Sequence, residues 1–240
     1  WEEGHHTEER ILAADEVVKS PGIPDTAPII QKIKAKNIPV ISEIEFAGRY
    51  TDAKMVCITG SNGKTTTTML TYHILKDAGL NVGLAGNVGA SLAYQVATVN
   101  HDVYVIELSS FQLDNMYDFK ANIAVLLNIT PDHLGWHKSH KNYALAKIKL
   151  FENMVDDDLV VIDVEDAGIH EFDEYIYTPG RRICKVAFDE PEGEDAAFVR
   201  DGKMIVRLKG VETTLVDTSD LKISGHHNVI NALCAATAAL

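Results

Sequence analysis

A glycine-rich segment in the first third of the chain has residue types that could hold a phosphate group. It reads TGSNGKTT from residue 59 to residue 66 and lies between an apolar run and a stretch with helical spacing. Glycines let backbone N–H groups turn toward an anion, and the start of a helix adds unpaired donors. Lys64 adds a mobile positive charge, and Thr65 offers a hydroxyl to Mg²⁺. These residue types predict a phosphate-binding loop.

The segment departs from the full eight-residue phosphate-loop pattern. That pattern has a glycine five residues before Gly63, and this chain has Ile58 there. The segment is therefore a shortened variant. The alternative is a glycine-rich turn between a strand and a helix, with Lys64 facing solvent. The apolar run before the segment and the helical spacing after it favour the phosphate loop.

Acidic and imidazole side chains follow two later apolar strands. A triphosphate carries about four negative charges, so an anionic nucleophile needs metal ions to neutralise the γ-phosphate. Glu107 ends one strand, and Asp132 and His133 follow the next. Ligands bind at the carboxyl ends of parallel strands, which makes Glu107 a candidate metal ligand, although taken alone it could equally be an ordinary strand-end charge. Mg²⁺ prefers oxygen, so His133 is a second choice as a ligand from chemistry alone.

The histidines do not form a zinc-protease motif. Residues 133–137 read HLGWH, in which Leu134 replaces the glutamate of HExxH and Gly135 weakens a helix. We exclude a zinc protease on this ground. The other histidines are interpreted as polar surface or turn residues: His5, His6, His137, His140, His226 and His227.

The elements around the loop predict an α/β fold. Residues 55–59 are a short apolar run, and residues 64–78 have apolar positions at helical spacing and end before Gly79. Such alternation predicts a mostly parallel, buried sheet covered by helices. The further strands are expected at 82–84, 103–108, 123–128 and 159–163, with helices near 90–97 and 142–153.

Between residues 183 and 223 the apolar period changes to two. Three runs show it, at 183–188, 197–200 and 204–208, and Asp201-Gly202 between the last two is a hairpin signal. We therefore expect a small antiparallel sheet here, followed by a helix over residues 228–240.

The first 50 residues predict the end of a separate domain. The pattern indicates a strand at 16–19, a turn at 20–24, a helix at 27–36, a strand at 40–41 and a helix at 43–49. Two short strands are too few to make an independently stable sheet. The chain starts at Trp1 and stops within an apolar helical run that has no stop signal, so we expect a fragment.

The composition restricts the class of protein. The 240 residues include 35 acidic and 22 basic side chains, a net charge of −13, and 46% are hydrophobic, which is typical of a globular protein and excludes a disordered one. We expect no membrane span and no nucleic acid partner. The three cysteines are far apart in sequence and suit neither a disulfide framework nor a thiolate metal site, which favours the cytoplasm.

Five motifs together resemble the Mur ligases, and the resemblance covers essentially the whole chain. It implies a central mostly parallel sheet with flanking helices and a phosphate loop, plus a small antiparallel β-sheet. Residues 1–50 would be the C-terminal part of a Rossmann-like, UDP-binding N-terminal domain, and residues 51–240 the central ATP-binding domain. The family's third domain, which binds the amino acid, would have no counterpart here. The motifs are TGSNGKTT at 59–66, GNVG at 86–89, ELSSFQL at 107–113, NITPDHL at 128–134 and GHHNVINA at 225–232.

The resemblance implies an ATP-dependent acid–amino-acid ligase in peptidoglycan precursor synthesis, and ELSSFQL indicates the family member that adds D-glutamate. In that reaction the carboxylate of UDP-N-acetylmuramoyl-L-alanine attacks ATP to give an acyl phosphate, and the amine of D-glutamate then displaces phosphate. Two alternatives remain. One is another amino-acid ligase of the family, and the other is a phosphate-loop module that uses nucleotide as a switch. We expect a cytoplasmic monomer.

The resemblance also assigns residues to the nucleotide and to the substrate. Lys64 would lie on the transferring phosphoryl group. The substrate-contacting residues would be Gly22, Asn87, Ser109, Gln112 and His133, with Gly22 a remnant of the uracil pocket. Those that hold the nucleotide would be Gly60, Ser61, Asn62, Gly63, Lys64, Thr65 and Thr66 on its phosphates, and Asn228 and Asn231 on adenine.

For the metals, the resemblance implies two Mg²⁺ ions. Thr65 and Glu107 would bind the first, and Glu107 and His133 the second, with Asp132 orienting His133. Lys147 matches the lysine that the family carbamylates, which turns a cation into an anionic oxygen ligand for Mg²⁺. The catalytic set would be Lys64, Glu107, His133 and Lys147.

From sequence alone, an exposed helical lysine is the alternative for Lys147. Lys149 is its nearest competitor for the modified position. It lies two residues further on, about 200° around a helix, and should therefore face elsewhere.

Overall fold

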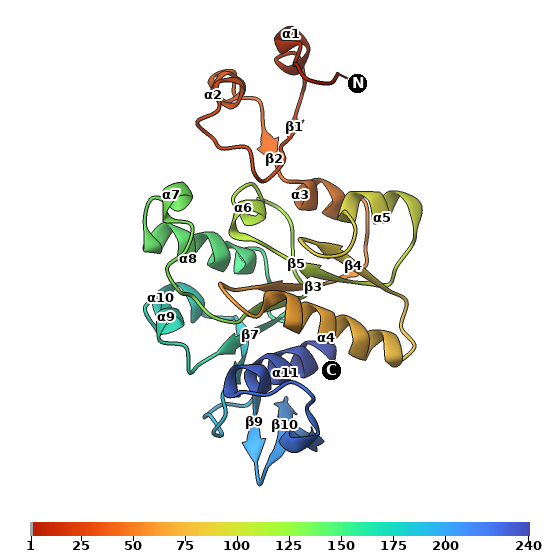
Figure 1. The fold of residues 1–240 in the computed structure, drawn as a ribbon, viewed down its shortest axis with the longest axis vertical. Coiled ribbons are helices and arrows are strands. Elements are labelled where there is room, and N and C mark those ends of the chain that lie inside the picture. The colour runs from red at the N-terminus through yellow and green to blue at the C-terminus, as the bar shows by residue number, and fades with distance from the viewer. Residues whose placement is uncertain (1) are drawn as a thin grey trace.

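The computed structural model describes residues 2–240. Its main feature is a nine-stranded sheet with helices on both faces, and a two-stranded sheet lies at the N-terminal end (Figure 1). The first elements of the chain are α1 (Glu8–Ile11), β1 (Val17–Val18), α2 (Pro28–Ala35), β2 (Val40–Ile41) and α3 (Glu43–Gly48).

The N-terminal elements confirm the predicted strands and helices. β1 and β2 pair in parallel, with Val17 opposite Val40. Ile30 and Ile33 of α2 are buried against them. This small cluster lies beyond the main sheet, and α3 connects the two parts by packing beside α5 (Figure 1).

Seven strands of the main sheet are parallel: the five that were predicted, β3 to β7, and also β8 and β9, which were expected in the antiparallel sheet. The sheet order is β11-β10-β9-β8-β7-β6-β3-β5-β4, and the strands from β3 to β9 run in one direction. The strand bounds are β3 (Lys54–Thr59), β4 (Val82–Gly86), β5 (Val103–Glu107), β6 (Ile123–Leu126), β7 (Leu159–Asp163), β8 (Arg182–Val186), β9 (Ala196–Arg200), β10 (Lys203–Leu208) and β11 (Val211–Asp217).

Helices cover both faces because the central strands are apolar on both. In β3, Met55 and Cys57 face the layer that contains α3, α5, α6 and α8, whereas Val56 and Ile58 face α4 and α11. The helices of the central part are α4 (Lys64–Asp77), α5 (Leu92–Thr98), α6 (Ser110–Leu113), α7 (Leu134–His137), α8 (His140–Ile148), α9 (Ala167–His170), α10 (Asp173–Ile176) and α11 (His226–Ala239), with 3₁₀ turns η1 (Lys149–Phe151) and η2 (Thr218–Asp220).

The prediction of a small separate antiparallel sheet is wrong in its placement. Residues 183–188 were expected to belong to it, but β8 pairs in parallel with β7 and continues the main sheet. The antiparallel strands β10 and β11 then extend that same sheet to its edge. The period-two pattern reports which face of a strand is buried, but it does not report the strand's partner or direction.

The hairpin signal was right. Asp201 and Gly202 join β9 to β10 with φ values of 51° and 74°, the positive values that a tight type I′ turn needs. β11 was not predicted, because its exposed sequence VETTLVD lacks the buried alternation of a strand with a core face.

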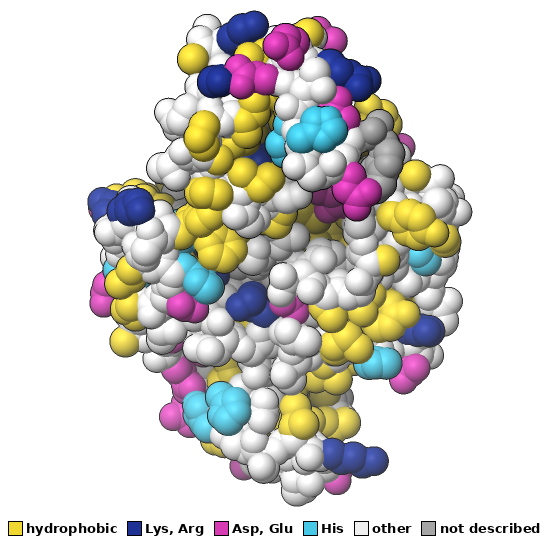
Figure 2. Space-filling model, turned by 45° about the horizontal axis from the view of Figure 1, so that its top comes forward, with side chains coloured by type: hydrophobic (Ala, Val, Ile, Leu, Met, Phe, Trp, Pro, Cys, Tyr) yellow, Lys and Arg dark blue, Asp and Glu magenta, His cyan; other side chains and the backbone are white. Residues whose placement is uncertain are grey.

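Charged side chains of both signs are mixed on the surface of the N-terminal part, which lies at the top of Figure 2. Lys32 pairs there with Glu8, and Lys34 pairs with Asp25. In residues 2–240, no helix is long and apolar enough to cross a membrane.

Candidate functional site

The predicted phosphate loop connects β3 to α4 at the carboxyl edge of the sheet. Gly63 has a φ of 82°, which favours glycine. A Cβ at Gly63 would also lie 2.6 Å from Oδ1 of Asn231, a side chain of α11. Both constraints explain the glycine. The loop therefore leads directly into the N-terminus of a 14-residue helix, where unpaired N–H groups attract anions.

Asn128, from the loop after β6, supports the phosphate loop. Its Oδ1 accepts hydrogen bonds from the backbone N–H groups of Ser61 (3.0 Å) and Asn62 (2.8 Å). Its Nδ2 donates to the carbonyl of Asn62 at 3.0 Å. Sequence reasoning did not assign Asn128 a role, although it begins the NITPDHL motif. It holds the loop in shape from a neighbouring strand end.

Lys64 folds back over its own loop. Its Nζ donates to the carbonyls of Gly60 (3.0 Å) and Ser61 (2.9 Å). Burial lowers the pKa of Lys64, while the charges of Glu107 and Asp132 oppose that shift. The amine is thus already at the loop, where an incoming phosphate could replace the carbonyls as its partner.

Glu107 lies at the end of β5 with its carboxylate pointing to the start of α4. Its side chain is 1% exposed. Oε2 accepts a hydrogen bond from the Thr65 hydroxyl and Oε1 accepts one from Nδ2 of Asn87, both at 2.8 Å. The structure therefore brings together three predicted site residues from three segments. The carboxylate of Glu107 and the hydroxyl of Thr65 are oxygen ligands of the type that a hard cation prefers.

Asp132 and His133 lie in the loop between β6 and α7. The His133 backbone has a φ of 51°, and its N–H donates to Oδ1 of Asp132 at 2.7 Å. The ring nitrogen Nε2 is 3.4 Å from Oδ2 of the same carboxylate. The His133 ring packs against Phe111, with 4.8 Å between ring centres. Both side chains are about half exposed, and the orientation of His133 by Asp132 stays a prediction.

Lys147 faces the phosphate loop from α8, and the alternative of an exposed lysine is wrong. Its side chain is 1% exposed, and its Nζ donates to the carbonyl of Gly60 at 2.8 Å. Burial, together with the charge of Lys64, lowers the pKa of Lys147 to about 7. Lys149 points elsewhere as expected, toward the carbonyl of Asp114 and over the ring of Tyr117.

Tyr143 is a site residue that sequence reasoning did not find. Its hydroxyl lies 3.0 Å from Oγ of Ser61, and the Nζ of Lys147 is 4.5 Å from the centre of its ring. Tyr143 therefore contacts the phosphate loop and the buried lysine at once. Its position four residues before Lys147, one helical turn away, was the available signal.

The predicted substrate residues Ser109 and Gln112 form a capping box at the start of α6. The Gln112 Oε1 accepts from the backbone N–H of Ser109 at 3.0 Å and from its hydroxyl at 2.9 Å. The capping box fixes both side chains at the start of α6, independently of any contact with a substrate. The interpretation of His137 as a surface residue is wrong, because it is 6% exposed and its Nε2 lies 2.9 Å from Oγ of Ser110.

The remaining predicted residues lie in two places. Asn231 is buried beside Gly63, and its Nδ2 donates to Oδ1 of Asn228 at 3.4 Å. Asn228 is half-buried on the first turn of α11, and through Asn231 it lies near the phosphate loop. Gly22 lies in the exposed N-terminal turn after β1, and no atom comes within 4 Å of a Cβ placed there.

The predicted metal ligands do not form a metal site of protein side chains alone. Among residues 2–240, no three His, Cys, Asp or Glu side chains are close enough together to hold an ion. The Glu107 carboxylate and the Thr65 hydroxyl fit a cation that takes its remaining ligands from a nucleotide phosphate or water, which is how Mg²⁺ usually binds. The two-ion assignment stays a prediction.

Comparisons with known proteins relate the chain to one family. The family model described as the Mur ligase middle domain matches residues 58–239. A curated relative from Bacteroides thetaiotaomicron, named UDP-N-acetylmuramoylalanine--D-glutamate ligase, is 54% identical over all of this chain and 53% of its own length. One of the same name from Porphyromonas gingivalis is 52% identical with the same coverage. The chain thus spans about half the length of these relatives.

Solved structures share the fold at low sequence identity. One is a UDP-N-acetylmuramate:L-alanyl-gamma-D-glutamyl-meso-diaminopimelate ligase from Neisseria meningitides. It superposes with a TM-score of 0.64 at 20% identity, over 96% of this chain and 75% of that one. Another is a UDP-N-acetylmuramoyl-L-alanyl-D-glutamate--2,6-diaminopimelate ligase, with a TM-score of 0.63 at 19% identity, over 89% and 55%. These matches concern the fold alone.

Proposed function

This chain belongs to the Mur ligase family, and from that premise we propose that it is the ATP-binding part of a ligase that joins D-glutamate to UDP-N-acetylmuramoyl-L-alanine. The observation that carries the proposal is the convergence at one loop. Lys64 and Lys147 both donate to the carbonyl of Gly60, and Glu107 accepts from Thr65 on the first turn of the same helix. The relatives over 50% identical, all named for this reaction, support the choice of amino acid.

We propose that residues 1–50 belong to the domain that holds the UDP end of the substrate and residues 51–240 to the central ATP-binding domain. The proposed domain boundary near residue 50 falls in the linker between α3 and β3. The whole enzyme would work in the cytoplasm, where its substrates are made. Because the chain spans about half the length of its relatives, each activity experiment below uses the full-length protein.

In the proposed reaction the chain binds and orients, since phosphoryl transfer depends mainly on position and charge. The phosphate loop, Gly60 to Thr66, holds the β- and γ-phosphates with its N–H groups. Lys64 leaves the loop carbonyls and places its charge on the transferring phosphoryl group. The substrate carboxylate attacks that group, ADP leaves, and the amine of D-glutamate displaces phosphate from the acyl phosphate.

The residues for substrate and metal are proposed on the same basis. Gly22, Asn87, Ser109, Gln112 and His133 would lie along the muramoyl substrate, and Asn228 and Asn231 would contact adenine. Thr65 and Glu107 would hold one Mg²⁺, and Glu107, His133 and a carbamylated Lys147 would hold the second. When bound, the two ions would neutralise the phosphate oxygens so that an anionic carboxylate can approach.

The test is a phosphate-release assay on the full-length enzyme with ATP. We expect release only when UDP-N-acetylmuramoyl-L-alanine and D-glutamate are both present. Release with meso-diaminopimelate or lysine in place of D-glutamate would assign the chain to another amino-acid ligase of the family. Nucleotide binding that depends on neither substrate would favour a nucleotide switch.

We expect Glu107→Gln to raise the Mg²⁺ concentration needed for half-maximal activity by about tenfold or more. The change keeps the shape of the side chain but replaces an anionic oxygen with a neutral amide, which is a poorer ligand for a hard cation. The measurement is a Mg²⁺ titration of initial rates at saturating substrates. The matched control is Glu43→Gln, at an acidic residue of α3 outside the site. An unchanged Mg²⁺ dependence in the Glu107 variant would contradict its role as a ligand.

A further inference from the structure

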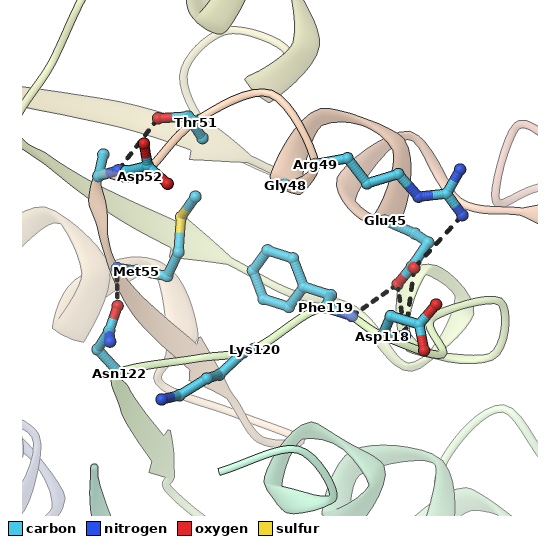
Figure 3. Close-up of a pocket in the computed structure, with 11 residues that line it drawn as sticks. Glu45, Gly48, Arg49, Thr51, Asp52, Met55, Asp118, Phe119, Lys120 and Asn122 are labelled. Carbon is cyan, nitrogen blue, oxygen red and sulfur yellow. Dashed lines mark hydrogen bonds and ion pairs between the residues drawn. The ribbon is translucent and has the colours of Figure 1, made fainter. Parts of the chain in front are cut away.

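The loop between α6 and β6, residues 114–122, is attached to α3 by one buried carboxylate. Glu45 of α3 is 1% exposed. Its Oε2 accepts the backbone N–H groups of Tyr117 (2.9 Å) and Phe119 (2.9 Å), and both of its oxygens lie 3.2 Å from the N–H of Asp118. Figure 3 shows the carboxylate pointing at this turn of the loop. Three converging N–H groups bind an anion far better than a neutral amide.

The same carboxylate continues into the N-terminal part of the chain. Arg49, one turn after Glu45, lies 3.6 Å from its Oε1. The other end of the Arg49 guanidinium donates to both carboxylate oxygens of Glu16, next to β1, at 3.0 and 2.9 Å. A continuous series of ion pairs and hydrogen bonds therefore runs from Glu16 through Arg49 and Glu45 to the loop 114–122.

Side-chain packing also holds this junction, because Ile44 and Ala47 of α3 share a buried apolar cluster with Met116, Phe119 and Ala121 of the loop. The end of α3, the linker at residues 49–53 and the loop 114–122 surround a cavity of about 270 Å³ (Figure 3). Phe119 packs on Gly48, where a Cβ would lie 2.7 Å from the ring. Beside this apolar packing, the Glu45 carboxylate fixes the direction of the loop backbone, because three N–H groups of residues 117–119 point at it.

The loop 114–122 directly follows α6, the short helix that carries Ser109 at its cap and Gln112 within it. The backbone N–H of Ser42, the residue that caps the start of α3, also donates to the carbonyl of Asn115 in the loop at 2.7 Å. Gly22, by contrast, belongs to the N-terminal part of the chain. The contacts of Glu45 and Arg49 therefore join the segment that follows Ser109 and Gln112 to the N-terminal part of the chain that carries Gly22.

We propose that Glu45 is a positioning residue that sets the α6 segment against the N-terminal part of the chain and so fixes the width of the muramoyl substrate cleft. Glu45 touches neither substrate nor nucleotide in this role. It acts through the backbone of residues 117–119 and through Arg49. The inference rests on the proposed function, because it needs a substrate that spans both parts.

The test compares Glu45→Gln with Glu43→Gln in the full-length enzyme. Glu43 is a matched control because it also joins α3 to the central part, by accepting from the Ser91 hydroxyl at 2.7 Å and from the N–H of Ala93, but at α5 and away from α6. We expect Glu45→Gln to raise the KM for UDP-N-acetylmuramoyl-L-alanine about tenfold, the cost of weakening hydrogen bonds to a charged group. The KM for ATP should change less than about twofold in both variants.

A second variant keeps the inference testable if Glu45→Gln does not fold. Arg49→Gln breaks the contacts with Glu16 at a half-exposed position and leaves the Glu45 carboxylate on its N–H groups. It should raise the same KM by about threefold, a smaller loss because exposed ion pairs contribute less. Direct titration of the muramoyl substrate in the absence of ATP should show the same weakening.

The outcomes separate this inference from the function on which it rests. If the unmodified enzyme does not use UDP-N-acetylmuramoyl-L-alanine, the proposed function fails. If it does, and Glu45→Gln changes both KM values equally or matches Glu43→Gln, then Glu45 only stabilises the fold and the inference is wrong. A selective rise in the KM for the muramoyl substrate supports it.

Discussion

Replacing Lys64 with alanine should lower the rate of acyl-phosphate formation by about a thousandfold, while the protein keeps its fold. The Lys64 amine contacts the carbonyls of its own loop and is placed to move onto a phosphate. Loss of one fixed charge or donor aimed at the developing transition-state charge costs about 10² to 10³ in rate, and a lysine on the transferring group supplies a full charge. The measurement is single-turnover ADP formation with saturating muramoyl substrate.

The control for Lys64 lies on the same helix. Lys76, in the last turn of α4, interacts with the hydroxyl and ring of Tyr72. Lys76→Ala removes the same charge from the same helix at its far end and should leave the rate within about twofold. A thermal midpoint for Lys64→Ala near that of the unmodified enzyme would show that the loss is one of chemistry. Near-normal turnover by Lys64→Ala would refute the role.

Much of the fold could be predicted because the central strands carry their own signature. A strand that is buried on both faces must be largely apolar, as residues 55–58 and 123–126 are, and such runs separated by helices favour a parallel sheet. The edge strand β11 gave no such signal. It is exposed along most of its length and its three apolar residues do not alternate with polar ones, so neither its existence nor its pairing with β10 could be derived from its pattern.

The site residues could be predicted where the chemistry requires a particular residue type. The residues that hold the site in place through hydrogen bonds between segments far apart in sequence could not. Thr65 and Glu107 belong to motifs whose residue types have a chemical reason, and the structure places them 2.8 Å apart. The supporting contacts of Asn128 and Glu45 join segments 66 and more residues apart through backbone N–H groups. No residue type marks such a partner in the sequence, since every residue except proline carries the same N–H.

Lys147 should behave as a carbamate in the working enzyme, and its replacement by alanine should lower activity by about a hundredfold. Its amine is buried at the carbonyl of Gly60, and burial with the nearby charge of Lys64 lowers its pKa to about 7. Near neutral pH a large fraction of the amine is therefore uncharged, which is the form that attacks CO₂. A second cation beside Lys64 would oppose Mg²⁺, whereas a carbamate offers a hard anionic oxygen.

Three variants distinguish the carbamate from a cation. Added acetate should restore part of the activity of Lys147→Ala, because a small carboxylate can occupy the place of the missing carbamate oxygens. Lys147→Arg should stay inactive, although it keeps the positive charge, because a guanidinium cannot be deprotonated in proteins. Lys149→Ala is the matched control, since that side chain contacts Asp114 and Tyr117 on the other side of the helix. It should keep activity within about twofold and show no response to acetate.

The dependence on CO₂ gives a readout that a structural role would not move. Removing dissolved CO₂ and bicarbonate should lower the activity of the unmodified enzyme, and adding bicarbonate should restore it. Neither change should affect Lys147→Ala, which has no amine to modify. The dependence should grow as the pH falls below about 7, because more of the Lys147 amine is then protonated. Normal activity in Lys147→Arg would show that Lys147 acts as an amine that holds the Gly60 carbonyl. The same conclusion would follow if CO₂ had no effect on the unmodified enzyme and acetate had no effect on Lys147→Ala.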